Sequence, residues 1–330
     1  MQLLGEKHGS VARLLAGELA DVENRFAAEL VSDLTCVNDL AKHIEQYRGK
    51  MLRPTLVLLS GLAARPDNPI VDEQRVVATV VEMVHVATLV HDDVLDESRV
   101  RRKTTTVNYL RGNEMAVMLG DYLISHAYHL CSSLEHQGAA RLIARTTNTV
   151  CEGELLQLSN RNNWSLDEQT YFDIIDRKTA SLCGVGCELG ARFADADPQT
   201  REALSRYGRL LGVAFQIIDD VLDLTGDPDV VGKSLGKDLE KGKLTLPLIH
   251  RLETAAPADR QMLLDSLRAE GPERVERVAT AVADSDAVEY ARRRAETLVD
   301  QAKDCLSGLP DSQFRHVLMD MAGAVVTRQL

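Results

Sequence analysis

The sequence predicts an all-α protein that forms one helical bundle over residues 1–330. Apolar residues recur at helical spacing along nearly the whole chain, and no stretch alternates with period two for long enough to indicate a sheet. No linker is long enough to divide the chain, and no segment is of low complexity. Together these observations favour a single large helical domain.

The predicted helices are separated by short polar or Gly/Pro breaks. One of them starts at Pro198, which suits a first helical turn, and Asp195 and Asp197 are its candidate caps. Up to that helix and including it, the predicted ranges are residues 11–30, 51–64, 72–98, 113–134, 139–160, 166–193 and 198–224. In the last third of the chain they are residues 243–254, 259–270, 274–283, 286–307 and 312–329.

Composition narrows the classes of partner. The chain has 330 residues, of which 45% are hydrophobic, and its net charge is −12. A chain this acidic is not suited to binding nucleic acid or an anionic membrane through its bulk charge. The N-terminus lacks the continuous apolar core of a signal peptide, and no apolar run reaches membrane-spanning length. We therefore expect no nucleic-acid partner and no stable insertion into a membrane.

The six cysteines form no CxxC pair and lie inside helical patterns. Cys183 and Cys187 are one turn apart, but no nearby His or Cys completes a zinc set. The cysteines are therefore predicted to be reduced core residues of a cytoplasmic protein.

The pentapeptide Asp-Asp-Val-Leu-Asp occurs twice, and each copy ends a long apolar stretch that is typical of a helix. The first pentad contains Asp92, Asp93 and Asp96, and the second contains Asp219, Asp220 and Asp223. Positions i and i+4 share one face of a helix, so the first and last aspartates of each pentad point the same way. Clustered carboxylates repel one another, which indicates a purpose other than stability.

Two such clusters facing each other would form an oxygen-rich cavity for hard divalent cations. Mg²⁺ is the natural occupant, because it binds a few carboxylates, keeps waters and accepts oxygens from a substrate phosphate. The alternative is two solvated acidic helix ends, but two identical pentads, each followed by basic residues, favour a metal–phosphate site.

Basic residues follow both pentads and also precede the first one. Past the first pentad lie Arg99, Arg101, Arg102 and Lys103. Past the second, residues 225–243 interleave four glycines with four lysines, namely Lys233, Lys237, Lys241 and Lys243. Lysines in such a loop can bind phosphate, although for Lys237 and Lys241 a solvated surface remains an equal alternative.

A third group of cations stands earlier in the chain. Lys50 and Arg53 lie at a predicted helix start, where backbone N–H groups also favour anions. Carboxylates that hold metal, with Arg and Lys beside them, indicate a diphosphate site.

With these motifs, the chain resembles the trans-isoprenyl diphosphate synthases (polyprenyl synthetases), most closely their medium- and long-chain bacterial members. The resemblance runs from about residue 49 to 248. The matching pieces are Gly-Lys-Met-Leu-Arg-Pro at 49–54, His85, the first pentad with Arg101 and Arg102, Gly-Asp-Tyr-Leu at 120–123, Lys178 with Thr179, Gln216 with the second pentad, and Gly-Lys-Leu-Thr-Leu-Pro at 242–247. Lys103 departs from the pattern, because the family commonly has Gly there.

The resemblance implies an isoprenoid-synthase bundle around a central cavity and a Mg²⁺-dependent prenyltransferase. Such an enzyme elongates an allylic diphosphate by head-to-tail (1′–4) condensation with isopentenyl diphosphate and releases diphosphate. The family holds the allylic diphosphate between its two aspartate clusters with three Mg²⁺, for which Mn²⁺ can substitute. The implied metal ligands are Asp92, Asp96 and Asp219, with Asp93, Asp220 and Asp223 in support.

Further roles follow from matching positions. The resemblance assigns the allylic substrate or the closing loop to Arg101, Lys178, Thr179, Gln216, Lys233 and Lys243. It assigns the metal-free isopentenyl diphosphate to Lys50, Arg53, His85 and Arg102. Each assignment has a structural alternative: His85 can be a core histidine, Gln216 a buried helix polar group, and Thr179 can bond back to its own helix.

Product length depends on the channel that receives the growing chain. Ala87 and Thr88, one turn before Asp92, are predicted to line it, and their small size favours a medium- or long-chain product such as a quinone side-chain precursor. A short-chain (farnesyl or geranylgeranyl) synthase is the alternative, and a class I terpene cyclase or an inactive partner subunit is disfavoured by the two intact pentads.

Residues 113–134 carry apolar side chains around much of their predicted helix. Such helices form a homodimer interface in the resembling family, so we expect a C₂ dimer.

Overall fold

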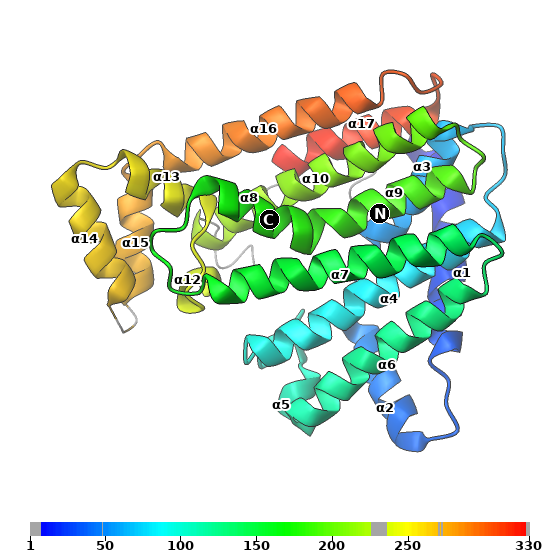
Figure 1. Ribbon diagram of the computed structural model, residues 1–330, viewed down its shortest axis with the longest axis horizontal. Helices are drawn as coiled ribbons and strands as arrows, with labels where there is room; N and C mark the ends of the chain where they lie inside the picture. Colours follow the sequence, from blue (N-terminus) through cyan, green and yellow to red (C-terminus); the bar gives the residue numbers. More distant parts are fainter. Residues whose placement is uncertain (1–7, 48, 226–235, 270, 272, 328–330) are drawn as a thin grey trace. The chain divides into compact units, whose positions relative to one another are not determined.

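A computed structural model describes residues 8–47, 49–225, 236–269, 271 and 273–327 (Figure 1). Helices account for nearly all of its regular structure. In the first half of the chain they are α1 (Gly9–Glu29), α2 (Thr35–Ile44), η3 (Glu45–Tyr47), α3 (Leu52–Ala64), α4 (Asp72–Leu95), α5 (Val107–Arg111), α6 (Asn113–Ser132) and α7 (Gln137–Ser159). They continue with α8 (Glu168–Ile175), η4 (Asp176–Ala180), α9 (Ser181–Arg192), α10 (Pro198–Thr225), α12 (Lys237–Glu240), α13 (Leu246–Thr254), α14 (Pro257–Arg268), α15 (Glu273–Ala283), α16 (Ala287–Cys305) and α17 (Gln313–Val326).

Most of the predicted helices are present, and the departures have local causes. Helix α2, which has ten residues and buries only Ile44, was not predicted. The predicted helix over residues 166–193 is interrupted by η4, a π-helical turn. A small antiparallel hairpin pairs β1 (Val100–Arg101) with β2 (Thr104–Thr105), whose two-residue strands are too short for alternation to reveal. At the start of α10, Asp197 is the cap that the structure selects, since its carboxylate accepts from the Thr200 N–H at 3.0 Å.

The chain divides into two compact units. The first comprises Met1–Asn148, Leu182–Gly208 and Cys305–Asp320, and the second comprises Thr149–Ser181, Arg209–Asp304 and Met321–Leu330. That the whole chain is one domain stays a prediction.

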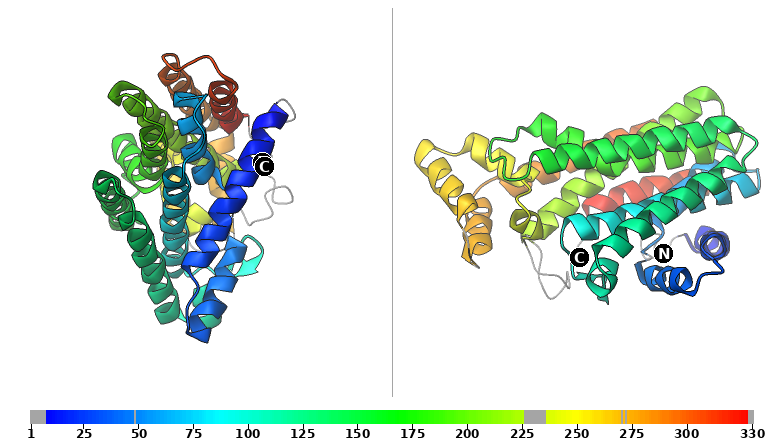
Figure 2. Two further views of the ribbon diagram at one scale, coloured as in Figure 1. Left: turned by 90° about the vertical axis from the view of Figure 1, so that its right-hand side faces the viewer. Right: turned by 60° about the horizontal axis from the view of Figure 1, so that its bottom comes forward.

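In the first unit, α4 packs along α6 and also contacts α3 and α1 (Figure 2). Val84, Ala87 and Leu123 are completely buried in the apolar core that these helices share. The first pentad stands at the C-terminal end of α4, so this packing holds it in place.

In the second unit, short helices pack around α8 and α13. The Tyr290 ring of α16 stacks on His250 of α13 at 3.9 Å, and its hydroxyl donates to Glu168 of α8 at 2.5 Å. These contacts fix the outer face of α8, which carries a tyrosine of the candidate site on its buried side.

Two predictions from composition, on membrane-spanning segments and on the cysteines, can be compared with the structure. Among the described residues, no helix combines the length and the apolar character that crossing a bilayer would need. All six cysteines are free: Cys131, Cys183 and Cys187 are buried, and Cys305 is half-buried. The expectation of a core position is wrong for Cys36 and Cys151, which are exposed.

Candidate active site

The first pentad forms the last turn of α4. The N–H of Asp96 donates to the Asp92 carbonyl at 2.8 Å, so these two aspartates stand one helical turn apart, and both are half-buried. The helix ends at Leu95, three residues earlier than predicted, because Glu97 adopts a left-handed conformation with φ of 49°. The N–H of Ser98 then donates to the Asp93 carbonyl at 2.9 Å, which closes a Schellman-type end.

The second aspartate of this pentad points into the protein. Asp93 is 1% exposed, and Arg101 binds it through Nε, at 3.0 and 3.1 Å from its two oxygens, and through a terminal nitrogen at 2.9 Å. Burial raises the pKa of Asp93, while the hydrogen bonds and charge of Arg101 oppose this shift. Asp93 therefore anchors Arg101 through a bidentate ion pair.

Arg101 is held there by the hairpin. Arg102 and Lys103 form its two-residue loop, with φ of 49° and 67°, and a two-residue loop with two positive φ values is a type I′ turn. Glycine is strongly preferred at the second loop position, which accounts for the Gly that the family commonly has in place of Lys103. The departure leaves Arg101 and Arg102 on a tight turn.

Arg102, Arg53 and His85 form a cationic group in the first unit. Arg102 donates to the Tyr47 carbonyl and lies against Gly49, where a Cβ would stand 2.5 Å from its guanidinium. Burial and then the charges of Arg53 and Arg102 lower the pKa of His85 well below its usual range, so its ring is neutral. The Nε of Arg53 is buried without a hydrogen-bond partner.

A buried unpartnered donor beside a second guanidinium is suited to an anion. Lys50 is exposed in the segment just before α3.

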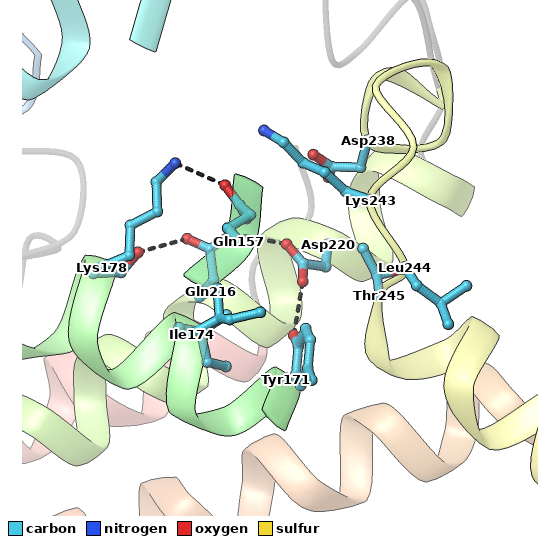
Figure 3. Close-up of a pocket in the computed structure, with 12 residues that line it drawn as sticks. Gln157, Tyr171, Ile174, Lys178, Gln216, Asp220, Asp238, Lys243, Leu244 and Thr245 are labelled. Carbon is cyan, nitrogen blue, oxygen red and sulfur yellow. Dashed lines mark hydrogen bonds between the residues drawn. The ribbon is translucent and has the colours of Figure 1, made fainter. Parts of the chain in front are cut away.

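The second pentad lies within α10, which continues to Thr225. Asp219 is exposed and Asp223 is half-buried, whereas Asp220 is 5% exposed. One Asp220 oxygen accepts from Gln216 at 2.7 Å, and the other accepts from the Tyr171 hydroxyl at 2.7 Å (Figure 3). Burial and the charge of Asp238 raise the pKa of Asp220 well above its usual range.

Asp223 holds the segment that follows the undescribed residues 226–235. Its carbonyl accepts from the Gly236 N–H at 2.8 Å, and its carboxylate accepts from the Asp238 N–H at 3.1 Å. Burial and the charge of Asp238 raise the pKa of Asp223 to about 6. Lys233, predicted as a substrate ligand, lies outside the described residues.

Lys178 and Thr179 lie in the π-helical turn η4, a feature that often occurs at functional sites. Lys178 donates to Gln157 at 2.9 Å and forms an ion pair with Glu154. Thr179 donates to Gln216 at 3.2 Å, so its hydroxyl contacts the residue one turn before the second pentad.

These side chains surround a cavity of about 90 Å³ in the second unit. In Figure 3 the amino groups of Lys178 and Lys243 both extend away from Tyr171. The cavity is lined by Gln157, Tyr171, Ile174, Ile175, Lys178, Thr179, Gln216, Asp220, Asp238, Lys243, Leu244 and Thr245.

The sequence reasoning missed Tyr171, Gln157 and Asp238. The available signal was spacing, because Tyr171 lies two turns before Lys178 on the predicted helix.

The carboxylates fit magnesium in pairs. Within the described ranges, no three Asp, Glu, His or Cys side chains are grouped as a ready set of metal ligands. Asp92 with Asp96, and Asp219 with Asp223, each provide two carboxylates one turn apart. Mg²⁺ at phosphate sites takes one or two carboxylates and completes its shell with substrate oxygens and water, so such pairs suffice.

Known prenyl diphosphate synthases resemble this chain over nearly its whole length. The sequence model of the family described as Polyprenyl synthetase matches residues 35–285. The octaprenyl diphosphate synthase of Escherichia coli is 34% identical over 319 residues, which are 96% of this chain and 98% of that protein. The all-trans-nonaprenyl-diphosphate synthase (geranyl-diphosphate specific) of Rhodobacter capsulatus is 36% identical over 94% of this chain and 97% of that protein.

Solved structures give the same result. A decaprenyl diphosphate synthase from Rhodobacter capsulatus superposes with a TM-score of 0.90 at 32% identity and covers 97% of this chain and 99% of its own. A polyprenyl synthase from Caulobacter crescentus CB15, complexed with calcium and isoprenyl diphosphate, gives 0.89 at 32% identity over 96% and 97%.

The fold and its neighbours place the protein among the all-α isoprenoid synthases, which confirms the predicted fold class. More narrowly, the chain belongs to the polyprenyl synthetase family, as its sequence indicated, and is a prenyltransferase.

Proposed function

We propose that this prenyltransferase elongates an allylic isoprenoid diphosphate by head-to-tail (1′–4) condensation with isopentenyl diphosphate and releases diphosphate. The observation that carries the proposal is the cationic group of Arg53, Arg102 and neutral His85, with the buried free donor on Arg53. This group supports a diphosphate site that uses guanidinium groups in place of metal. Condensation requires such a second diphosphate site, and a cyclase does not. Lys50 is proposed to join this site.

The allylic diphosphate is proposed to bind through Mg²⁺, with three ions and with Mn²⁺ as a substitute. Asp92, Asp96 and Asp219 would be the principal ligands, with Asp223 in support. When bound, the metal would supply positive charge that stabilises the departing diphosphate. The Caulobacter crescentus structure, a complex with calcium and isoprenyl diphosphate, supports a divalent cation at such a site.

Asp93 and Asp220 are proposed to support the site indirectly. Asp93 holds Arg101, and Asp220 holds Gln216, which accepts from Thr179. Lys178, Lys243 and the undescribed Lys233 would neutralise the allylic diphosphate, since ammonium groups bind phosphate oxygens as point charges. In this arrangement the second aspartate of each pentad fixes a neighbouring side chain, and the other aspartates bind metal.

We further propose that the product is a medium- or long-chain all-trans diphosphate, suited to serve as a quinone side-chain precursor. It is supported by the octaprenyl and nonaprenyl synthases among the relatives. Ala87 is completely buried in the core between α4 and α6, and the Thr88 hydroxyl is bonded to the His85 carbonyl at 2.7 Å. We propose that these small residues leave room for a long chain.

The product-length proposal predicts that Ala87→Phe shortens the product by whole isoprene units, because one helical turn is about 5.4 Å. Initial condensation should be largely retained, and stability should fall by about 1–3 kcal/mol from overpacking. Chain-length analysis of the products checks this. An unchanged distribution from a folded, active variant would show that Ala87 does not face the growing chain.

We also propose that the chain is one catalytic domain, acts as a homodimer and works in the cytoplasm. The dimer is supported by helix α6, which buries one face against α4 and exposes Met115, Val117 and Met118, at 38%, 40% and 62%. Exposed apolar side chains on one helix favour a protein partner. Light scattering should give twice the 36.4 kDa chain mass, and a particle of single-chain mass at micromolar concentration would contradict the dimer.

The function as a whole is tested by incubating the purified protein with Mg²⁺, farnesyl diphosphate and isopentenyl diphosphate. The expected products are diphosphate and, after phosphatase treatment, a longer prenyl alcohol. A cyclic hydrocarbon would identify a cyclase instead, and turnover that depends on a second subunit would identify a partner chain. A farnesyl- or geranylgeranyl-length product from shorter primers would select the short-chain alternative.

A further inference from the structure

His91 lies directly before the first pentad and has no role in the proposed chemistry, yet its ring is closely packed against α6. It lies over Gly120 of α6, where an added Cβ would stand 2.1 Å from the His91 Nε2 and 2.4 Å from its Cδ2. No side chain other than hydrogen fits at Gly120 while the ring keeps this position. The Gly-Asp-Tyr-Leu segment at 120–123 therefore begins with a residue that makes room for the pentad's neighbour.

The same ring forms a polar contact with α6. Its Nε2 lies 3.1 Å from the Val117 carbonyl and 3.5 Å from a carboxylate oxygen of Asp121. A carbonyl oxygen only accepts, so Nε2 carries the hydrogen and donates it. Because Val117 and Asp121 are one turn apart, the contact spans the α6 turn around Gly120.

We infer that His91 is a positioning residue that fixes the last turn of α4 against α6, with Gly120 as the required complement. This inference rests on the proposed metal site. Asp92 follows His91 directly and Asp96 is one turn further, so a rotation or shift of this turn moves both carboxylates together. Residues that hold metal ligands in place commonly change metal affinity or activity when they are removed.

The test compares four proteins: Gly120→Ala, His91→Ala, the double variant, and Gly17→Ala as a control. Gly17 is a helix glycine of α1 whose added Cβ would meet no heavy atom within 4 Å. The measured quantities are the Mg²⁺ concentration for half-maximal activity, kcat, and the urea midpoint of unfolding.

Each of the two single variants should raise the Mg²⁺ requirement or lower kcat by roughly 10–100-fold. The double variant should be no worse than His91→Ala, because the added methyl group then has no ring to displace. Gly17→Ala should behave as the wild type in activity.

Two further variants of His91 separate the effect of losing the hydrogen bond from the effect of losing side-chain volume. His91→Gln keeps an N–H donor and should restore part of the Mg²⁺ response, whereas His91→Leu fills the space without a donor and should not. This pair carries the test if Gly120→Ala does not fold. Equal responses of His91→Gln and His91→Leu, additive effects of Gly120→Ala and His91→Ala, or a wild-type Mg²⁺ response in Gly120→Ala would each overturn the inference.

Asp92→Asn keeps the two proposals distinguishable. If Asp92→Asn leaves the Mg²⁺ response unchanged, the metal site itself is wrong. If Asp92→Asn abolishes the response while the His91 variants retain it, only the positioning role fails.

Discussion

The two pentads have the same five residues, and each turns its second aspartate inward, but different groups receive it. Asp93 meets a cation, Arg101, on the hairpin that follows α4. Asp220 meets neutral donors, the Tyr171 hydroxyl and the Gln216 amide. The first pentad ends its helix, whereas α10 continues past the second.

This difference shows that the pentad sets only the spacing of the carboxylates, and the surroundings set what each one does. Next to Arg101, the charge of Asp93 is compensated, and its pKa shift comes from burial against an opposing cation. Next to Asp238, the charge of Asp220 is disfavoured both by burial and by a second carboxylate. The same substitution is therefore expected to act differently in the two places.

The largest expected effect belongs to the outward aspartates, where the pentads should behave alike. Asp92→Asn and Asp219→Asn should each lower kcat by roughly 10²–10³, since each removes charge that helps to stabilise the leaving diphosphate. The fold should survive, because removing a carboxylate relieves repulsion. Asp300→Asn, at an exposed position of α16, serves as the control in steady-state assays. Near-wild-type turnover of either pentad variant would remove that aspartate from the metal site.

A smaller effect should separate the two substrates. Arg53→Ala should mainly raise KM for isopentenyl diphosphate. Lys178→Ala should mainly weaken the binding of the allylic substrate or slow its ionisation. Each loses a charge-assisted contact of about 1.5–3 kcal/mol, or roughly ten- to a hundredfold. Kinetics with each substrate varied in turn measure the split, and equal effects of both changes on both substrates would refute the assignment.

Stability should distinguish the inward aspartates. Asp93→Asn leaves Arg101 without its counter-charge and should lower the free energy of unfolding by about 1.5–3 kcal/mol. Asp220→Asn removes a carboxyl group whose ionised form is disfavoured by burial and whose partners are neutral, so the loss of stability should be about 1 kcal/mol or less. Urea unfolding in chelator measures both. Equal losses would mean that the cationic and neutral surroundings are energetically equivalent.

The smallest effect concerns the hairpin that follows the first pentad. Lys103→Gly should raise the free energy of unfolding by up to about 1 kcal/mol, because glycine adopts a left-handed conformation without a Cβ clash. Thermal unfolding measures it, with Lys42→Gly, inside α2, as a destabilised control. A loss of stability in Lys103→Gly would show that the lysine side chain contributes more than its backbone costs.

The sequence predicted the fold class, most helices and the family, because helical periodicity over long segments and two pentads are strong local signals. It also selected Lys178, Thr179, Gln216, Asp220 and Lys243, which the structure gathers around one cavity. It could not predict which groups Asp93 and Asp220 contact, because the pentads are identical and the partners, Arg101 and Tyr171, lie outside them. The π-helical turn at Lys178 was also hidden, because one extra residue in a helical turn barely alters the apolar pattern.

The central claim, that the first aspartate of a pentad binds metal while the second positions a neighbour, is tested most directly by titrating Mg²⁺ calorimetrically. The titration uses Asp92→Asn and Asp93→Asn with a non-reactive allylic diphosphate analogue. Asp92→Asn should lose the Mg²⁺-dependent binding. Asp93→Asn should retain it within about tenfold and unfold at lower urea. Loss of Mg²⁺-dependent binding in a folded Asp93→Asn protein, equal to the loss in Asp92→Asn, would contradict the account.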